Sequence, residues 1–173
     1  MREIENVLLC GLGAIGTIYA NIINKNANLK VLVDKKRLDR YKESPINFNG
    51  EDLHFDYVLP DETNFKADLI IIATKFDGIF EAIDNIENFV HNDTIIMSLL
   101  NGITSEKLIE NKYGNKVLYS YFIGHSAVRK NRFVTQDGVN TIVFGGEKTK
   151  VEAVKNFFDK VGINYNIPED IQY

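Results

Sequence analysis

The sequence predicts an α/β protein built on a Rossmann-type, doubly wound, mainly parallel sheet with a short antiparallel extension. Apolar runs typical of buried strands alternate with segments of helical periodicity over about 120 residues, which is the pattern of repeated βαβ units. A glycine-rich stretch, residues 11–16, lies where the first strand passes into the first helix. The composition of the 173 residues, 45% hydrophobic and 25% charged, is that of a globular domain.

The first three predicted elements form a βαβ unit. Residues 7–10 are a short apolar run that ends at a glycine, as a buried parallel strand does. Residues 29–33 form the second strand. The segment between them, residues 14–25, carries apolar side chains three and four positions apart, which predicts a helix with one buried face formed by Ile15, Ile18, Tyr19, Ile22 and Ile23.

The middle of the chain continues the alternation. A polar stretch without a predicted element follows the second strand, and residues 46–58 predict a hairpin that turns at Asn49-Gly50. Residues 67–74 are the clearest central strand, because they are apolar and bounded by charged residues. The elements after it are a helix that buries Ile79, Phe80, Ile83, Ile86 and Val90, a strand over 94–100, a helix over 106–113 and a strand over 117–123.

The pattern changes after this strand. Residues 132–146 predict two short strands, antiparallel to each other, around Asp137-Gly138. A helix and a strand near 163–167 follow, the helix with its inward face formed by Val151, Val154, Phe157, Phe158 and Val161. We therefore expect one domain over residues 1–167. The polar residues 168–173 lack a closing element, and we expect them to be a junction to a further domain of the native protein.

The glycine-rich stretch predicts a dinucleotide-binding site. Its residues, Gly11-Leu12-Gly13-Ala14-Ile15-Gly16, match the G-x-G-x-x-G pattern in the required context, after a strand and at the start of a helix. Gly11 allows the tight turn, Gly13 lets the backbone approach a diphosphate, and Gly16 lets the helix pack closely on the strand. The free amides of the helix start, with the positive end of its dipole, bind the anion.

The end of the second strand bears on which dinucleotide is bound. Asp34 follows Gly16 by 18 residues, and a carboxylate at this point accepts hydrogen bonds from the adenosine ribose, which selects NAD. Lys35, Lys36 and Arg37 follow at once, and these cations are able to pair with the 2′-phosphate of NADP. A solvated charge run explains the same three residues, so the sequence leaves NAD and NADP both open.

Two further strand ends carry polar residues toward the same edge of the sheet. Thr74 and Lys75 close the central strand, where an ammonium group is suited to a phosphate, a ribose or a substrate carboxylate. Asn101 closes the next strand, and its amide both donates and accepts hydrogen bonds, as a ribose or a substrate hydroxyl requires. An ordinary turn explains Asn101-Gly102 equally well.

Other features exclude several function classes. The net charge of −4 argues against a nucleic-acid partner, and no stretch reaches the ~20 apolar residues that span a bilayer. No spacing of histidine and cysteine indicates a metal site, and His125 is expected to be structural or at the surface. The single cysteine, Cys10, excludes an internal disulfide, is expected to be buried in its strand, and fits a cytoplasmic location.

Taken together, these residues resemble the amino-terminal domain of the ketopantoate reductases (2-dehydropantoate 2-reductases). The resemblance covers nearly the whole chain. It rests on GLGAIG, on ATK closing a strand, on LLNG with Asn101 26 residues after Lys75, and on GHSAVRK followed by GVNTIVFGG. The lysine–asparagine pair and the short strands after the Rossmann core are more specific than the glycines.

The resemblance implies a function beyond what spacing indicates. It implies reduction of 2-dehydropantoate to pantoate with NADPH, in the biosynthesis of pantothenate and coenzyme A. Residues 11–16 would then hold the diphosphate, Lys75 and Asn101 would be catalytic residues at the nicotinamide and substrate, and Ala127 would touch the cofactor through its backbone. The family often has arginine where Asp34 stands, which leaves NAD possible. Its general-acid lysine belongs to a helical carboxyl-terminal domain, which would begin after Tyr173.

Two other functions remain open from the sequence. One is an NAD(P)-dependent reductase of a different 2-keto acid, because membership of a family fixes fold and cofactor better than substrate. The other is a dinucleotide-sensing domain without catalysis, in which Lys75 and Asn101 are incidental. The expected partner is a small-molecule 2-keto acid, and a homodimer is possible because a missing domain would leave apolar surface exposed.

Overall fold

The computed structural model describes residues 3–100, 103–124 and 127–169, and its main sheet confirms the predicted fold class. Six strands run parallel in the order β5-β2-β1-β6-β7-β8, and the order reverses between β1 and β6. Their bounds are β1 (Asn6–Cys10), β2 (Asn28–Leu32), β5 (Tyr57–Val58), β6 (Leu69–Ile72), β7 (Ile95–Ser98) and β8 (Val117–Gly124). Such a reversal is the point where doubly wound proteins bind ligands.

Two more strands extend this sheet beyond β8. β11 (Asn140–Gly145) pairs antiparallel with β8, and β12 (Tyr165–Asn166) pairs parallel with β11. The register aligns the carboxyl ends of the central strands, because Cys10 of β1 lies opposite Leu32 of β2 and Ile72 of β6. The residues that follow these three strands are therefore brought to one edge of the sheet.

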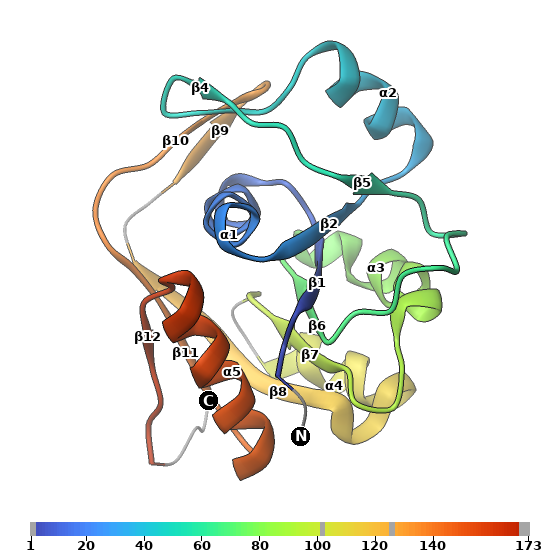
Figure 1. Ribbon diagram of the computed structural model, residues 1–173, viewed down its shortest axis with the longest axis vertical. Helices are drawn as coiled ribbons and strands as arrows, with labels where there is room; N and C mark the ends of the chain where they lie inside the picture. Colours follow the sequence, from blue (N-terminus) through green and yellow to red (C-terminus); the bar gives the residue numbers. More distant parts are fainter. Residues whose placement is uncertain (1–2, 101–102, 125–126, 170–173) are drawn as a thin grey trace.

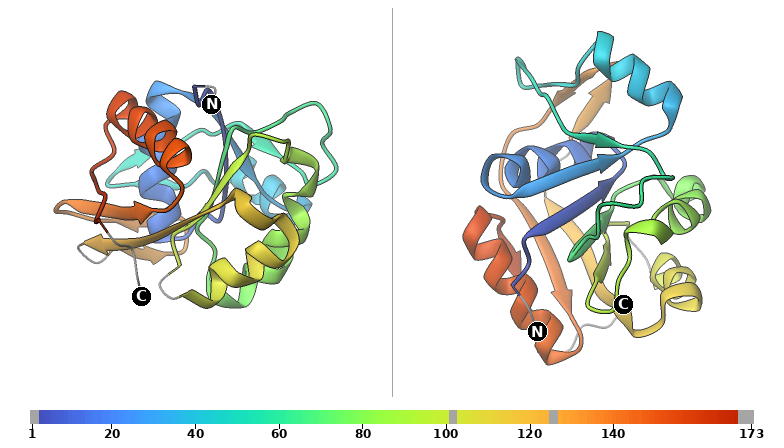
Figure 2. Two further views of the ribbon diagram at one scale, coloured as in Figure 1. Left: turned by 90° about the horizontal axis from the view of Figure 1, so that it is seen from below. Right: turned by 45° about the vertical axis from the view of Figure 1, so that its right-hand side comes forward.

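Helices cover both faces of the sheet (Figures 1 and 2). α1 (Ala14–Asn26) and α5 (Lys148–Val161) lie on one face, and α3 (Ile79–Asn85) and α4 (Ile103–Tyr113) lie on the other. β1 buries side chains toward both faces, with Leu9 in the cluster on the α1 side and Leu8 in the cluster on the α3 side. This burial explains why the strand is an unbroken apolar run rather than an alternating one.

A second, four-stranded sheet lies beside α1, at the top of Figure 1. It contains β4 (Glu51–Asp52), β3 (Asn47–Phe48), β10 (Phe133–Thr135) and β9 (Val128–Lys130), in that order. The predicted hairpin at Asn49-Gly50 is confirmed, since both residues have the positive φ angles (49° and 93°) of a tight turn. Buried Val134 of β10 joins this sheet to the main core.

The predicted pairing within residues 132–146 is wrong. Both strands exist, but β10 pairs with β9 and β3 in the small sheet, whereas β11 pairs with β8 in the main sheet. The turn that closes the β9–β10 pair lies earlier, where Asn131 adopts a φ of 57°. Gly138, with a φ of 91°, lies where the chain passes from one sheet to the other.

Two helices differ from the prediction. The polar stretch after β2 forms α2 (Lys35–Glu43), which buries only Tyr41 and so has no apolar stripe to reveal it. The predicted burial of Phe80 is wrong, because its side chain is 62% exposed. α3 is a short helix between the 3-10 turns η1 (Phe76–Gly78) and η2 (Glu87–Phe89), and Phe80 projects about 100° away from Ile79.

The end of the described chain agrees with the prediction. α5 buries the aromatic and aliphatic side chains expected of it, apart from partly buried Val151, and stops at Gly162, which has a φ of 88°. α4 is followed by a 3-10 turn, η3 (Gly114–Lys116). Within the described ranges, no helix combines the length and the apolar character that crossing a membrane requires.

Candidate functional site

The turn between β1 and α1 is packed directly against the end of β6. The carbonyl of Cys10 accepts a hydrogen bond from the Ala73 amide at 2.8 Å. Gly11 has a φ of 101°, and a Cβ atom on it would lie 2.8 Å from the backbone of Ala73 and Thr74. A Cβ atom on Gly16 would overlap the Gly11 carbonyl oxygen. Side chains are therefore excluded at both positions by backbone that is already in place.

Gly13 differs from these two glycines. It is the N-cap of α1 in an extended conformation (φ −72°, ψ −165°), and no side chain caps the helix there. A Cβ atom on Gly13 would find no heavy atom within 4 Å. The fold does not need a glycine at this position, so the open space in front of the helix start is available to a ligand. Helix N-termini of this kind bind phosphate groups.

A cavity of about 400 Å³ opens at this turn, along the carboxyl edge of β1, β2 and β6. Its size is within the range of small-molecule sites, which is roughly 300–1,000 Å³. The structure brings together seven of the residues predicted to bind the cofactor as its lining: Gly11, Leu12, Gly13, Asp34, Arg37, Thr74 and Lys75. Residues from three separate strand ends thus meet where the sheet order reverses.

The remaining predicted residues lie elsewhere or outside the described chain. Ala14, Ile15 and Gly16 form the first turn of α1 behind the cavity lining, and Lys35 and Lys36 are exposed on α2. Ala127 packs against the main core and does not line the cavity. Asn101 and His125 lie outside the residues that the structure describes.

Asp34 is engaged by the helix that follows it. One carboxylate oxygen accepts the Arg37 amide at 2.7 Å and so caps α2, and the other accepts Arg37 Nη1 at 2.6 Å. The cations after Asp34 therefore have different surroundings. Arg37 lines the cavity beside Asp34, whereas Lys35 pairs with Asp39 along the helix at 2.8 Å.

The end of β6 supplies two polar groups to the cavity. The Thr74 hydroxyl oxygen is buried, and within the described residues it has no hydrogen-bond partner. A buried hydroxyl without a partner is costly, which fits a ligand that would complete it. Lys75 follows as the exposed N-cap of η1 and also lines the cavity. Thr74 and Lys75 thus lie at the edge where the sequence predicts them.

Five lining residues with polar or charged side chains that could contact a ligand were missed by sequence analysis: Tyr41, Asp77, Glu81, Asn85 and Arg129. Asp77, Glu81 and Asn85 lie four residues apart after the central strand, a spacing that places them on one face of a helix. This spacing could have predicted a polar helix face at the site, but the apolar residues of the same segment were used to assign its buried face instead. Arg129 has no local signal, because the small sheet brings it to the loop from 117 residues away.

Cys10 also lines the cavity, but its thiol is unreactive. Its side chain is 3% exposed, and burial raises the pKa of the thiol to about 12. A thiol with this pKa is protonated at neutral pH and is a poor nucleophile. In the described part of the chain, no three His, Cys, Asp or Glu residues are grouped as metal ligands.

Comparison with known proteins identifies the family of the chain. The model of the family described as ketopantoate reductase PanE/ApbA matches residues 7–148. The 2-dehydropantoate 2-reductase of Lactococcus lactis is 32% identical over 128 residues, which cover 69% of this chain and 40% of that protein.

Solved structures show the same fold. The putative 2-dehydropantoate 2-reductase of Enterococcus faecalis superposes with a TM-score of 0.80 at 20% identity, and the match covers 96% of this chain and 57% of that one. D-mandelate dehydrogenase, solved with NADH and anilino(oxo)acetate, gives a TM-score of 0.80 at 22% identity, with 96% and 57% covered. The dimeric ketopantoate reductase of Staphylococcus aureus gives 0.70 at 20% identity, with 96% and 60% covered.

The chain thus spans about half the length of the proteins it resembles. The family match extends from β1 to the start of α5 and includes the glycine-rich turn, Asp34 and Lys75. On this match, which covers more than half of its residues, the chain belongs to the ketopantoate reductase PanE/ApbA family.

Proposed function

We propose that this chain is the cofactor-binding domain of an NADPH-dependent reductase that converts 2-dehydropantoate to pantoate, a step toward pantothenate and coenzyme A. One observation carries the proposal: the space in front of Gly13 is open, although the neighbouring glycines are closed in by backbone. A diphosphate bridge fits there against the start of α1. Relatives that carry the 2-dehydropantoate 2-reductase name support the substrate.

The domain assignment follows from the same proposal. Residues 1–167 would form the NAD(P)-binding domain and residues 168–173 a junction. Residues 170–173 lie outside the described chain. We also propose a cytoplasmic location, and a homodimer by analogy with the dimeric Staphylococcus aureus neighbour.

The lining residues suggest how the site works. When bound, a nicotinamide dinucleotide supplies the hydride for the ketone. The amides at the start of α1 would bind its diphosphate, and the Thr74 hydroxyl would complete its hydrogen bonding with the same ligand. Lys75 would orient the 2-keto acid or the ribose with its ammonium group, and Asn101 would serve as a second donor and acceptor.

A proton must also reach the developing alkoxide. We assign the general acid to residues outside this chain, as the family resemblance implies. A positioned acid contributes roughly 10²–10⁴-fold to such a step. The chain alone would therefore bind the cofactor without efficient turnover.

Titration of the purified chain tests this proposal. NADPH quenching of intrinsic tyrosine fluorescence, or calorimetry, should reveal one saturable site, while NADPH consumption with 2-dehydropantoate should stay far below the ~1–10³ s⁻¹ of ordinary enzymes. Absence of binding to both NADPH and NADH would overturn the proposal. Turnover at an ordinary enzymatic rate would overturn the assignment of the acid to residues outside the chain.

A second function has a specific observation in its favour. Asp34 places a carboxylate just after β2, which favours NADH, and one structural neighbour is a D-mandelate dehydrogenase solved with NADH. The alternative is therefore an NADH-dependent reductase of another 2-keto acid. Tighter binding of NADH than of NADPH by the unmodified chain would favour it.

Replacing Asp34 with serine is expected to raise the ratio of NADP⁺ to NAD⁺ affinity about tenfold. Two like charges about 4 Å apart repel by about 1 kcal/mol in water and about 4 kcal/mol near a protein surface, so removing the carboxylate favours the extra phosphate. Serine keeps the N-cap of α2, whereas alanine loses it at a cost of about 1 kcal/mol. Both variants should shift the calorimetric ratio, but only Asp34→Ala should lower the melting temperature. An unchanged ratio in Asp34→Ser would show that Asp34 does not face the ribose.

A further inference from the structure

Arg129 reaches the glycine-rich turn from the small sheet. It lies on β9, and its guanidinium Nη1 donates a hydrogen bond to the carbonyl oxygen of Leu12, between Gly11 and Gly13. Its Nη2 donates to the Tyr41 hydroxyl at 3.3 Å, and its Nε donates to the Asn131 carbonyl at 2.8 Å. The guanidinium also lies over the Tyr41 ring, with Cζ 5.8 Å from the ring centroid. Three elements thus fix one cation at the edge of the cavity.

This cation has no acidic partner in the described chain. No described carboxylate lies within salt-bridge distance of Arg129, whereas Arg37 pairs with Asp34 and Arg132 pairs with Asp52 at 2.7 Å. A guanidinium has five N–H donors, and only three of those of Arg129 are accounted for by the contacts above. A half-buried cation held by neutral groups and facing a cavity is arranged to receive an anion.

The position of Arg129 indicates which part of the dinucleotide it faces. Its Tyr41 contact ties it to α2, one helical turn beyond Arg37, and both arginines line the cavity with Asp34. In this fold the acidic residue that follows β2, here Asp34, lies at the ribose 2′ position. Arg129 therefore approaches that position from the loop side, while Arg37 approaches it from α2.

We propose that Arg129 is a specificity-determining residue that binds the 2′-phosphate of NADP(H) together with Arg37. The inference rests on the proposed dinucleotide function. It adds a residue whose positive charge offsets the repulsion between the Asp34 carboxylate and a 2′-phosphate. Asp34 and Arg37 neutralise each other, so these two residues and Arg129 together carry one net positive charge where a dianionic group would bind. The small sheet then has a role in binding, because its β9–β10 turn carries the Asn131 carbonyl that orients the guanidinium.

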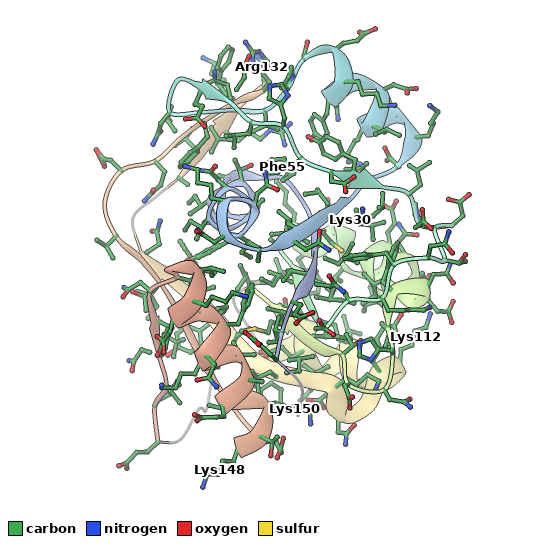
Figure 3. All side chains as sticks on the ribbon, viewed as in Figure 1. Lys30, Phe55, Lys112, Arg132, Lys148 and Lys150 are labelled. Carbon is green, nitrogen blue, oxygen red and sulfur yellow. The ribbon has the colours of Figure 1, made fainter. Side chains whose placement is uncertain are left out.

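Replacing Arg129 with methionine tests the proposal, since methionine keeps much of the length without the charge. Calorimetric titration with NADP⁺ and NAD⁺ should show at least a tenfold loss of NADP⁺ affinity and less than a threefold change for NAD⁺. The probes 2′-AMP and 5′-AMP should separate in the same way, with only 2′-AMP weakened. Arg132→Met is the matched control, because Arg132, labelled at the top of Figure 3, pairs with Asp52 and is not one of the residues that line the cavity; it should change neither affinity.

The possible results separate the two proposals. Equal losses for NADP⁺ and NAD⁺ in Arg129→Met, or no loss for either, would overturn the role at the 2′-phosphate. Retained NAD⁺ binding shows that the glycine-rich turn is still formed in the variant, so a merely structural role would not produce the selective loss. Failure of the unmodified protein to bind either dinucleotide would instead overturn the proposed function.

Discussion

Gly13→Val is expected to lower dinucleotide affinity at least a hundredfold, about 2.7 kcal/mol, with little effect on the folded chain. The two effects separate because the Cβ position of Gly13 is empty of protein atoms yet lies on the cavity wall. The backbone there is extended, a conformation that valine adopts freely. A branched side chain at this point would occupy the space in front of the α1 amides, and the diphosphate could no longer approach them.

The measurement is a calorimetric titration with NADPH and NADH, paired with thermal unfolding of the same samples. Valine is a poor N-cap, so we expect a loss of up to about 1 kcal/mol in the free energy of unfolding. Gly13→Ser is the matched variant, because serine caps well and is smaller; it should be as stable as the original chain and bind with intermediate affinity. Unchanged affinity in Gly13→Val would place the dinucleotide somewhere other than this turn.

The centre of the main sheet was predictable because strands such as β6 and β7 are buried on both faces. A strand such as β6 must be apolar at every position, and glycine or charged residues bound it clearly. α2 was not predictable in this way, since its single buried side chain, Tyr41, leaves no periodic stripe. The antiparallel pairs failed for another reason. The sequence of a strand of two or three residues does not indicate which strand it pairs with. The segment of β10 was therefore predicted to pair with that of β11, whereas it pairs with β9 and β3.

In the candidate site, too, residues next to buried parallel strands were predictable from the sequence and residues brought in by the small sheet were not. Gly11, Asp34 and Thr74 were predictable because each follows a recognisable strand, and parallel strands bring their carboxyl ends to one edge. Arg129 was not, because it depends on the small sheet and on a contact with Tyr41, neither of which leaves a local pattern. Arg37 lines the cavity and Lys35 does not, because residues two apart on a helix point in different directions.

Gly16→Ala is expected to destabilise the fold itself, and by more than the changes considered at Gly13. The added methyl would overlap the Gly11 carbonyl oxygen and lie 3.0 Å from its carbon and 3.3 Å from the Ala73 side chain. Backbone atoms cannot rotate aside, so α1 would have to move away from β1 and β6. The buried face of α1, which includes Tyr19 and Ile23, would lose packing with it. Overpacking of this kind costs about 3 kcal/mol or more in the free energy of unfolding.

Thermal unfolding measures this loss directly. For a chain of this size, about 3 kcal/mol corresponds to a fall of roughly 6–12 °C in melting temperature. Gly13→Ala is the matched control, because it adds the same methyl group three residues earlier, where no heavy atom lies within 4 Å. It should melt within about 2 °C of the original chain, since a poorer N-cap costs only a fraction of a kcal/mol when glycine is replaced. Equal melting temperatures for the two alanine variants would mean that α1 does not need its close approach to Gly11. In that case the two glycines would differ only in whether they contact the ligand, and not in their effect on the stability of the fold.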